Sequence, residues 1–100
     1  MIIYNVTINV DDDAHHDWLE WMRKVHIPDV LSTGLFTGYR LCRLLDIQDD
    51  GSTYSVQYSC KSLEEYNTYK TEHAPRLQQE TSKKFGNKFT AFRTLLEVVE

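Results

Sequence analysis

The sequence has little of what defines several classes of protein. Two cysteines in 100 residues exclude a disulfide-rich scaffold. Positive charge is not in excess, because 11 Lys and Arg stand against 15 Asp and Glu and give a net charge of −4. This balance argues against a nucleic-acid partner, since binding phosphates needs a basic face. Apolar runs are only a few residues long, so we expect no segment that spans a membrane.

The start of the chain, MIIYNVTINV, shows neither the basic segment nor the small-residue cleavage site of a signal peptide. We therefore expect a cytoplasmic protein whose two thiols are both reduced. One hundred residues suit one hydrophobic core, and no stretch is long or simple enough to act as a linker. The chain is thus expected to form a single domain over residues 1–100.

Four stretches have the period-two alternation or the β-branched composition of strands. They are residues 2–10, 36–47, 53–60 and 88–99. Between the second and the third, Asp50-Gly51 is the strongest short hairpin signal in the chain. If these two residues form the centre of the turn, Arg43 lies opposite Tyr58 in the hairpin.

Helical spacing of apolar residues predicts two helices, each interrupted near a proline. The first begins at Asp12 or Asp13 as N-cap and is expected to stop or kink at Pro28. The second opens with the capping box SLEE at 62–65, runs to about residue 84 and is expected to kink at Pro75.

The order strand, helix, strand, strand, helix, strand predicts an α+β fold. Two such halves form the ferredoxin-like βαββαβ arrangement, a four-stranded antiparallel sheet with two helices on one face. The halves also resemble each other, because YNVTIN at 4–9 matches YSVQYS at 54–59 and His-x-Pro occurs at 26–28 and 73–75. We interpret this echo as a constraint of the fold rather than as a duplication.

One face of the first and third predicted strands carries only small uncharged polar side chains. They are Asn5, Thr7, Asn9, Thr53, Ser55, Gln57 and Ser59. A face in bulk water should contain Lys and Glu in a chain with 26% charged residues, whereas these groups suit a second sheet packed across them. The sequence predicts a homodimer through this face, and a solvent face that lacks charge is the alternative. Cys42 and Cys60 fall on opposite faces of the sheet, so no disulfide is expected.

Two histidines, an arginine and a tyrosine are the candidates for a ligand site. His26 and His73 lie on apolar helical stripes beside a proline, where an imidazole can bind a ligand or merely a carbonyl that the proline frees. Arg43 and Tyr58 are expected on the sheet face that meets the helices. A guanidinium there needs a carboxylate, carbonyls or an anion, unless it reaches water from the strand edge. Arg93 stays unassigned, because the last strand is apolar on both faces.

These four residues together suit a small anionic or aromatic ligand, held in a pocket between helices and sheet. Two function classes stay open: a binding module without chemistry, which we favour, and a cofactor-free enzyme of the monooxygenase or isomerase kind. The stretch DDDAHHD contains metal-ligand types, but neighbouring histidines point about 100° apart on a helix. We interpret it as a solvated helix start and expect no metal.

Nearly the whole chain resembles an uncharacterised bacterial family, domain of unknown function 4286. The resemblance rests on IIYNVTINV, WLEWMRKVHIPDVLSTG, TYSVQYS, HAPRL and AFRTLLEV. That family is similar to the dimeric α/β-barrel superfamily, whose best-known branch contains the antibiotic-biosynthesis monooxygenases. The resemblance implies a ferredoxin-like protomer whose sheet pairs with another across a dimer, and it implies no activity.

The haem-degrading branch of that superfamily uses an Asn in its first strand and then a Trp and a His in its second helix. Asn5 or Asn9 matches the first of these, whereas Tyr69 and Gln79 stand at the Trp and His positions. Two of the three residues are missing, so the resemblance implies no haem, and we expect no cofactor.

Overall fold

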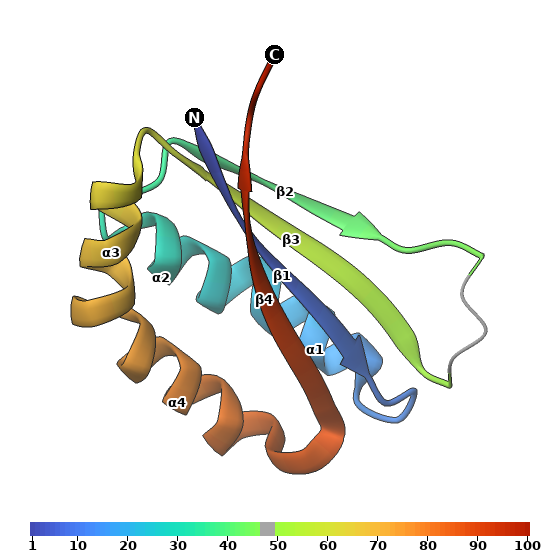
Figure 1. The fold of residues 1–100 in the computed structure, drawn as a ribbon. Helices are drawn as coiled ribbons and strands as arrows, with labels where there is room; N and C mark the ends of the chain where they lie inside the picture. Colours follow the sequence, from blue (N-terminus) through green and yellow to red (C-terminus); the bar gives the residue numbers. More distant parts are fainter. Residues whose placement is uncertain (47–49) are drawn as a thin grey trace.

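A four-stranded antiparallel sheet forms one layer of the protein, with the strands in the order β2-β3-β1-β4 (Figure 1). The computed structural model describes residues 1–46 and 50–100. The strands are β1 (Ile2–Val10), β2 (Gly38–Arg43), β3 (Ser52–Cys60) and β4 (Phe89–Glu97). β1 and β3 are central, whereas β2 and β4 are the two edges. This arrangement confirms the α+β, ferredoxin-like fold that the sequence predicts.

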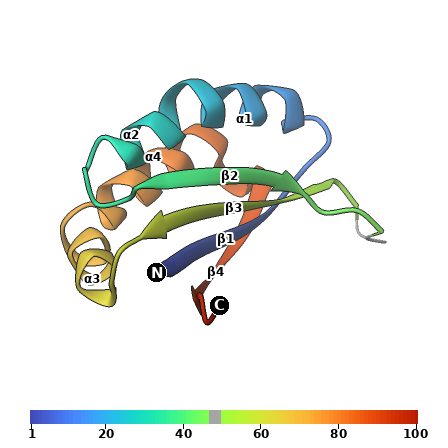
Figure 2. The same cartoon turned by 90° about the horizontal axis from the view of Figure 1, so that it is seen from above.

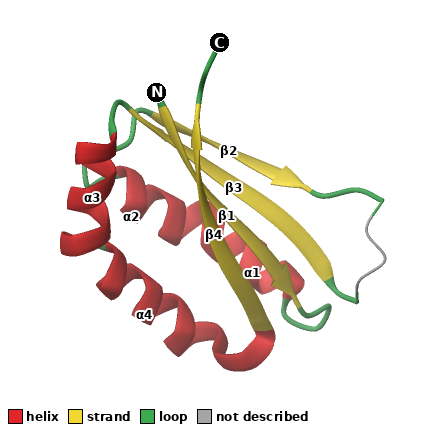
Figure 3. Cartoon of the chain, viewed as in Figure 1, coloured by secondary structure: helices red, strands yellow, loops and turns green. Residues whose placement is uncertain are grey.

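The helices form the second layer, on one face of the sheet (Figures 2 and 3). They are α1 (His15–Trp21), the π-helix η1 (Met22–His26), α2 (Ile27–Leu31), α3 (Leu63–Glu72), α4 (Ala74–Phe85) and the 3₁₀ turn η2 (Gly86–Lys88). None of the helices in the described part of the chain is long and apolar enough to cross a membrane.

The first helical segment continues past Pro28 and ends at Leu31, so of the two predicted alternatives, a stop or a kink, the stop is wrong. Proline has no N–H, and its ring would clash with the carbonyl four residues earlier. The chain avoids the clash by widening into the π-helix η1, in which the Ile27 N–H bonds the Met22 carbonyl. Pro28 thus distorts the helix and does not end it.

The start of this segment also differs from the prediction. Ala14 is the N-cap residue, and no side chain caps the helix. The predicted cap Asp13 is held elsewhere, because its carboxylate pairs with Lys88 Nζ at 2.7 Å. The second predicted kink is confirmed, since α3 and α4 are separate helices that meet at His73 (φ −124°, ψ −38°), just before Pro75.

The register of the β2–β3 hairpin differs from the prediction. Arg43 lies opposite Tyr54, not Tyr58, and Cys42 lies opposite Ser55. The connection is longer than a two-residue turn, because Asp46 already has a left-handed φ of 59° before the chain reaches Gly51. The shift is an even number of residues, so each side chain keeps its predicted face. The predicted end of the second strand at residue 47 lies outside the described residues.

Gly51 permits the close approach of this hairpin to β1. We expect Gly51→Ala to destabilise the protein by more than the cost of placing a Cβ on a left-handed residue. Its φ is +79°, and a Cβ there would lie 2.5 Å from the Val10 carbonyl oxygen. A left-handed residue with a Cβ costs about 1–2 kcal/mol by itself. Gly34 also has φ +79° but has nothing within 4 Å of a built Cβ, so Gly34→Ala measures that part alone. Urea denaturation of both variants should show the larger loss for Gly51→Ala, and equal losses would contradict the contact.

The two faces of the sheet differ as predicted. Alternate residues of β1 and β3 are buried against the helices, including Val6, Val56 and Tyr58. The intervening polar residues are half-buried, except Thr53, which is buried. Both cysteines are free; Cys60 is buried on the helix side and Cys42 is half-buried.

Candidate functional site

A cavity of about 200 Å³ lies between the helices and the sheet. β1, β3 and β4 supply one wall and the helical segments supply the other. The aromatic part of the wall consists of Tyr4, Trp18, Tyr58, Tyr69 and Phe89. The aliphatic part consists of Val6, Ile8, Met22, Val56 and Ala91. Five further residues supply the remaining polar groups: His26, Gln78, Thr81, Ser82 and Arg93.

The exposed lining residues place the opening of the cavity between α4 and β4, at the edge of the sheet farthest from β2. Of the residues that line it, Ser82 of α4 and Arg93 of β4 are exposed, whereas Trp18, Val56 and Tyr58 are buried. A ligand would thus meet Arg93 at the opening and the aromatic wall farther inside.

Arg93 is a site residue that the sequence alone left unassigned. β4 pairs with β1 so that Arg93 lies opposite Val6, a residue buried on the helix side. Its Nε donates a hydrogen bond to the Tyr4 hydroxyl at 3.2 Å. Knowledge of the β1–β4 register would have placed Arg93 on the helix side of the sheet, because Arg93 pairs with Val6.

His26 lines the cavity from the π-helix η1. Its ring stacks on Trp21, with centroids 5.1 Å apart, and Nδ1 lies 3.4 Å from Thr81 Oγ1. Burial lowers the pKa of His26 from 6.5 to about 4, although the charges of Asp29 and Glu80 oppose this change. The imidazole is therefore neutral at neutral pH and can both donate and accept a hydrogen bond.

Three phenols surround the inner part of the cavity. Burial raises the pKa of Tyr58, Tyr69 and Tyr4, although Arg93 partly opposes this effect at Tyr4. All three are neutral hydroxyl groups at neutral pH. The Tyr4 ring lies 5.9 Å from the Tyr58 ring and 5.6 Å from the Tyr69 ring, which makes the wall a contiguous aromatic surface.

Trp18 contributes its ring to the wall but no hydrogen-bond donor for a ligand. Its Nε1–H is buried and has no hydrogen-bond partner in the described part of the chain. The nitrogen has less than 1 Å² of accessible surface, so a molecule in the cavity does not reach it without movement of neighbouring side chains.

The structure brings two of the four predicted site residues together at the cavity, His26 and Tyr58, and places the other two elsewhere. Arg43 is exposed on the edge strand β2, donates to Ser52 Oγ at 3.1 Å and lies over the Tyr54 ring. It reaches water from the strand edge, the alternative that the sequence left open.

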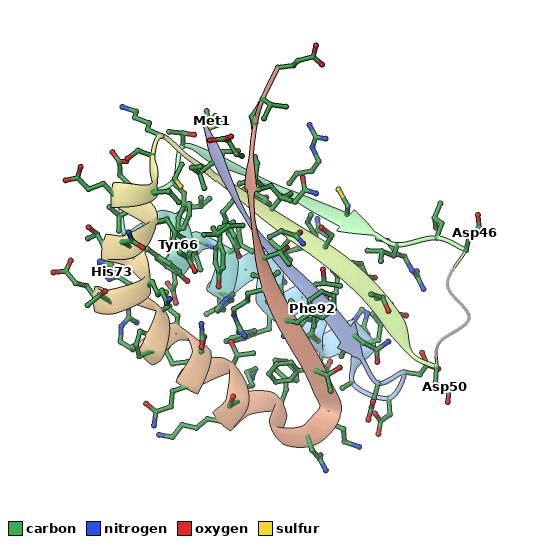
Figure 4. All side chains as sticks on the ribbon, in the orientation of Figure 1. Met1, Asp46, Asp50, Tyr66, His73 and Phe92 are labelled. Atoms are coloured by element: carbon green, nitrogen blue, oxygen red, sulfur yellow. The ribbon has the colours of Figure 1, made fainter. Side chains whose placement is uncertain are left out.

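His73 is half-buried at the junction of α3 and α4, outside the lining of the cavity (Figure 4). The His73 ring stacks on the Tyr69 ring, with centroids 6.4 Å apart, and the His73 backbone N–H donates to the Tyr69 backbone carbonyl. The helix break leaves this residue outside the cavity, whereas His26, in the π-helix, lines it. The two His-x-Pro sites therefore differ in surroundings.

Of the residues considered for a metal or haem, Tyr69 alone lines the cavity. Within residues 1–46 and 50–100, no three His, Cys, Asp or Glu side chains are grouped to hold a metal ion. His15 bonds the Tyr54 hydroxyl, and His16 pairs with Glu20. Asn5 and Asn9 alternate with the buried residues of β1, so they lie on the sheet face opposite the cavity.

The family model described as "Domain of unknown function (DUF4286)" matches residues 1–99. No curated protein matches the chain in sequence.

Several solved structures share the fold. A dimeric ferredoxin-like protein from an uncultured marine organism is 17% identical, with a TM-score of 0.71 over 100% of this chain and 96% of its own. An antibiotic biosynthesis monooxygenase is 18% identical, with a TM-score of 0.65 over the whole of both chains. A mutant of MhuD with two manganese protoporphyrin IX molecules bound per active site is 20% identical, with a TM-score of 0.71 over 100% of this chain and 96% of its own. At these identities the likeness concerns the fold alone.

Proposed function

This chain belongs to the DUF4286 family, and we propose that it binds a small molecule, anionic or aromatic, in the cavity between helices and sheet. The observation that carries the proposal is the composition of the cavity wall. Ligand sites are concave and mostly apolar, with a few polar groups that fix orientation. Here the apolar wall is combined with Arg93 at the opening and with His26, both of which face one enclosed space.

The volume supports a small ligand. A dry apolar cavity of about 150 Å³ is large enough to bind benzene, whereas drug-sized ligands occupy about 300 Å³ or more. At about 200 Å³, the cavity accommodates one ring with a small substituent. A tetrapyrrole is far larger than this space, which supports a site without haem.

A homodimer in the cytoplasm is the second part of the proposal. The polar groups of the open sheet face are already paired with one another: Ser55 Oγ donates to Asn5 Oδ1 at 2.6 Å, and Asn5 Nδ2 donates to Thr94 Oγ1 at 3.2 Å. A face whose hydrogen bonds are satisfied internally loses water at little cost. Two apolar residues of β4 lie on the same face, Phe92 (labelled in Figure 4) and Leu96, and they are 62% and 47% exposed. A sheet of a second copy would cover both.

A cofactor-free enzyme of the monooxygenase or isomerase kind is the second candidate. It rests on the neutral His26 imidazole, which can accept a proton from a molecule in the cavity. The low pKa that keeps His26 neutral also makes it a weak base, so we favour binding without chemistry.

The two methionines provide a direct test of binding. Met22 lines the cavity, and Met1 is exposed at the start of the chain. With methyl-labelled methionine, titration with phenol, benzyl alcohol and benzoate should move the Met22 methyl resonance and leave that of Met1 unchanged. Ala91→Trp fills the cavity and should abolish the shift. Val25→Trp adds the same ring on the outer side of the helix and should preserve it. A Met22 resonance that none of the three compounds moves would refute the proposal.

A further inference from the structure

The charge of the cavity is the starting point for a narrower description of its ligand. The chain has 15 acidic residues, yet none of those in the described part of the chain lines the cavity. Among the described residues that line the cavity, Arg93 is the one permanently charged residue. Among the described residues, no carboxylate lies within 4.0 Å of its guanidinium. With His26 neutral, the guanidinium of Arg93 is the single charged group in the lining of the cavity.

The guanidinium is also oriented for a ligand. Its Nε donates a hydrogen bond to the Tyr4 hydroxyl. Its two terminal nitrogens donate to no residue in the described part of the chain. The free side of a guanidinium presents two parallel donors, which match the two oxygens of a carboxylate. Arg93 also stands at the opening, where a charged group can keep part of its hydration.

The interior accepts the uncharged part of the ligand. Beyond Arg93 the wall is formed by the Tyr4, Tyr58 and Tyr69 rings, with aliphatic residues beside them. The volume of about 200 Å³ is enough for one six-membered ring with a small substituent. A phosphomonoester carries a second negative charge, for which this cavity has no cation.

We infer that the cavity selects a single-ring aromatic carboxylate, with its carboxylate bound by Arg93 at the opening and its ring against the tyrosines. The inference rests on the proposed binding function and narrows the ligand from anionic or aromatic to both at once. Arg93 thus determines specificity, and the aromatic wall provides most of the contact area.

Three single-ring probes separate charge from ring binding at a pH above the second pKa of the phosphonate: benzoate, its planar neutral isostere benzamide, and phenylphosphonate, which is a dianion under this condition. We expect benzoate to bind at least about tenfold more tightly than benzamide, the fold-change that corresponds to one charge-assisted hydrogen bond. Phenylphosphonate should bind more weakly than benzoate. The Met22 methyl shift reports occupancy of the cavity in each case.

Two arginine variants assign the effect. Arg93→Gln should weaken benzoate binding by at least about tenfold and leave benzamide binding within about twofold, which also shows that the cavity is intact. Arg43→Gln removes an exposed arginine from the opposite edge strand and should change neither benzoate binding nor benzamide binding. If benzamide and benzoate bind equally and both move Met22, the carboxylate inference fails and the binding function stands. If neither moves Met22, both fail.

Discussion

Acidification from about pH 6.5 to about pH 4 is expected to lower the free energy of unfolding by roughly 3 kcal/mol through His26 alone. The unfolded imidazole takes up a proton near its ordinary pKa of 6.5, whereas the buried imidazole resists it until about pH 4. Within this window the unfolded state binds more protons, so stability falls as the pH falls. Above this pH window His26 does not lower the free energy of unfolding, and below the window the loss reaches its full value.

His26→Gln tests this expectation because it keeps a polar side chain of similar size without a proton to gain. Urea denaturation at about pH 7 and about pH 4 should show a smaller difference for the variant than for the wild type. Carboxylates such as Asp13 and Glu65, whose pKa values are lowered by Lys88 and by Ser62, also titrate in acid. They are present in both proteins, so the comparison between wild type and variant removes their effect.

His73→Gln is the matched control, since it alters the other His-x-Pro site outside the cavity. It should retain the wild-type dependence of stability on pH. An identical pH dependence in the wild type and His26→Gln would show that the pKa of His26 is the same in the folded and unfolded states, as for an imidazole exposed to water. This result would contradict its placement against Trp21 and Thr81.

Thr7→Lys is expected to raise the dissociation constant of the proposed homodimer by at least about 100-fold. Thr7 lies in the middle of β1, between Ser55 of β3 and Phe92 of β4. Each copy would carry an unpaired ammonium into the interface, and a buried charge without a partner costs about 3–5 kcal/mol. Sedimentation velocity across a dilution series measures the shift, and circular dichroism verifies that the protomer stays folded.

Thr71→Lys introduces the same charge at an exposed position on α3 and should leave association unchanged. A Thr7→Lys protein that dimerises as tightly as the wild type would exclude this face as the interface. A wild-type chain that sediments as a monomer at micromolar concentration would refute the dimer itself.

Most of the fold could be predicted because period-two alternation identifies β1 and β3 and their two faces. The first helix was harder, because its buried residues Trp18, Met22, Ile27 and Val30 include a step of five between Met22 and Ile27. In an α-helix this step turns a side chain about 140° away from the stripe. Helical periodicity therefore does not reveal the π-helix, and the sequence predicts only a stop or a kink at Pro28.

The candidate site could be predicted only in part, and for a different reason. His26 was found because it lies on an apolar stripe near a proline, but His73 has the same signal and lies outside the cavity. The hairpin motif at Asp50-Gly51 favoured a tight turn, whereas the observed register depends on the whole β2–β3 connection. Arg93 was unassigned because its face depends on pairing with β1, a contact between the two ends of the chain.

The cavity and the polar face of the sheet lie on opposite sides of one β-layer. In a dimer formed through that face, two sheets about 10 Å apart would separate the two cavities, and each would open at its own α4–β4 edge. No side chain would be shared between the two binding sites. Ligand binding should then be non-cooperative, with one molecule per protomer and a Hill coefficient of about 1, and its affinity should not depend on whether the protein is diluted into monomers.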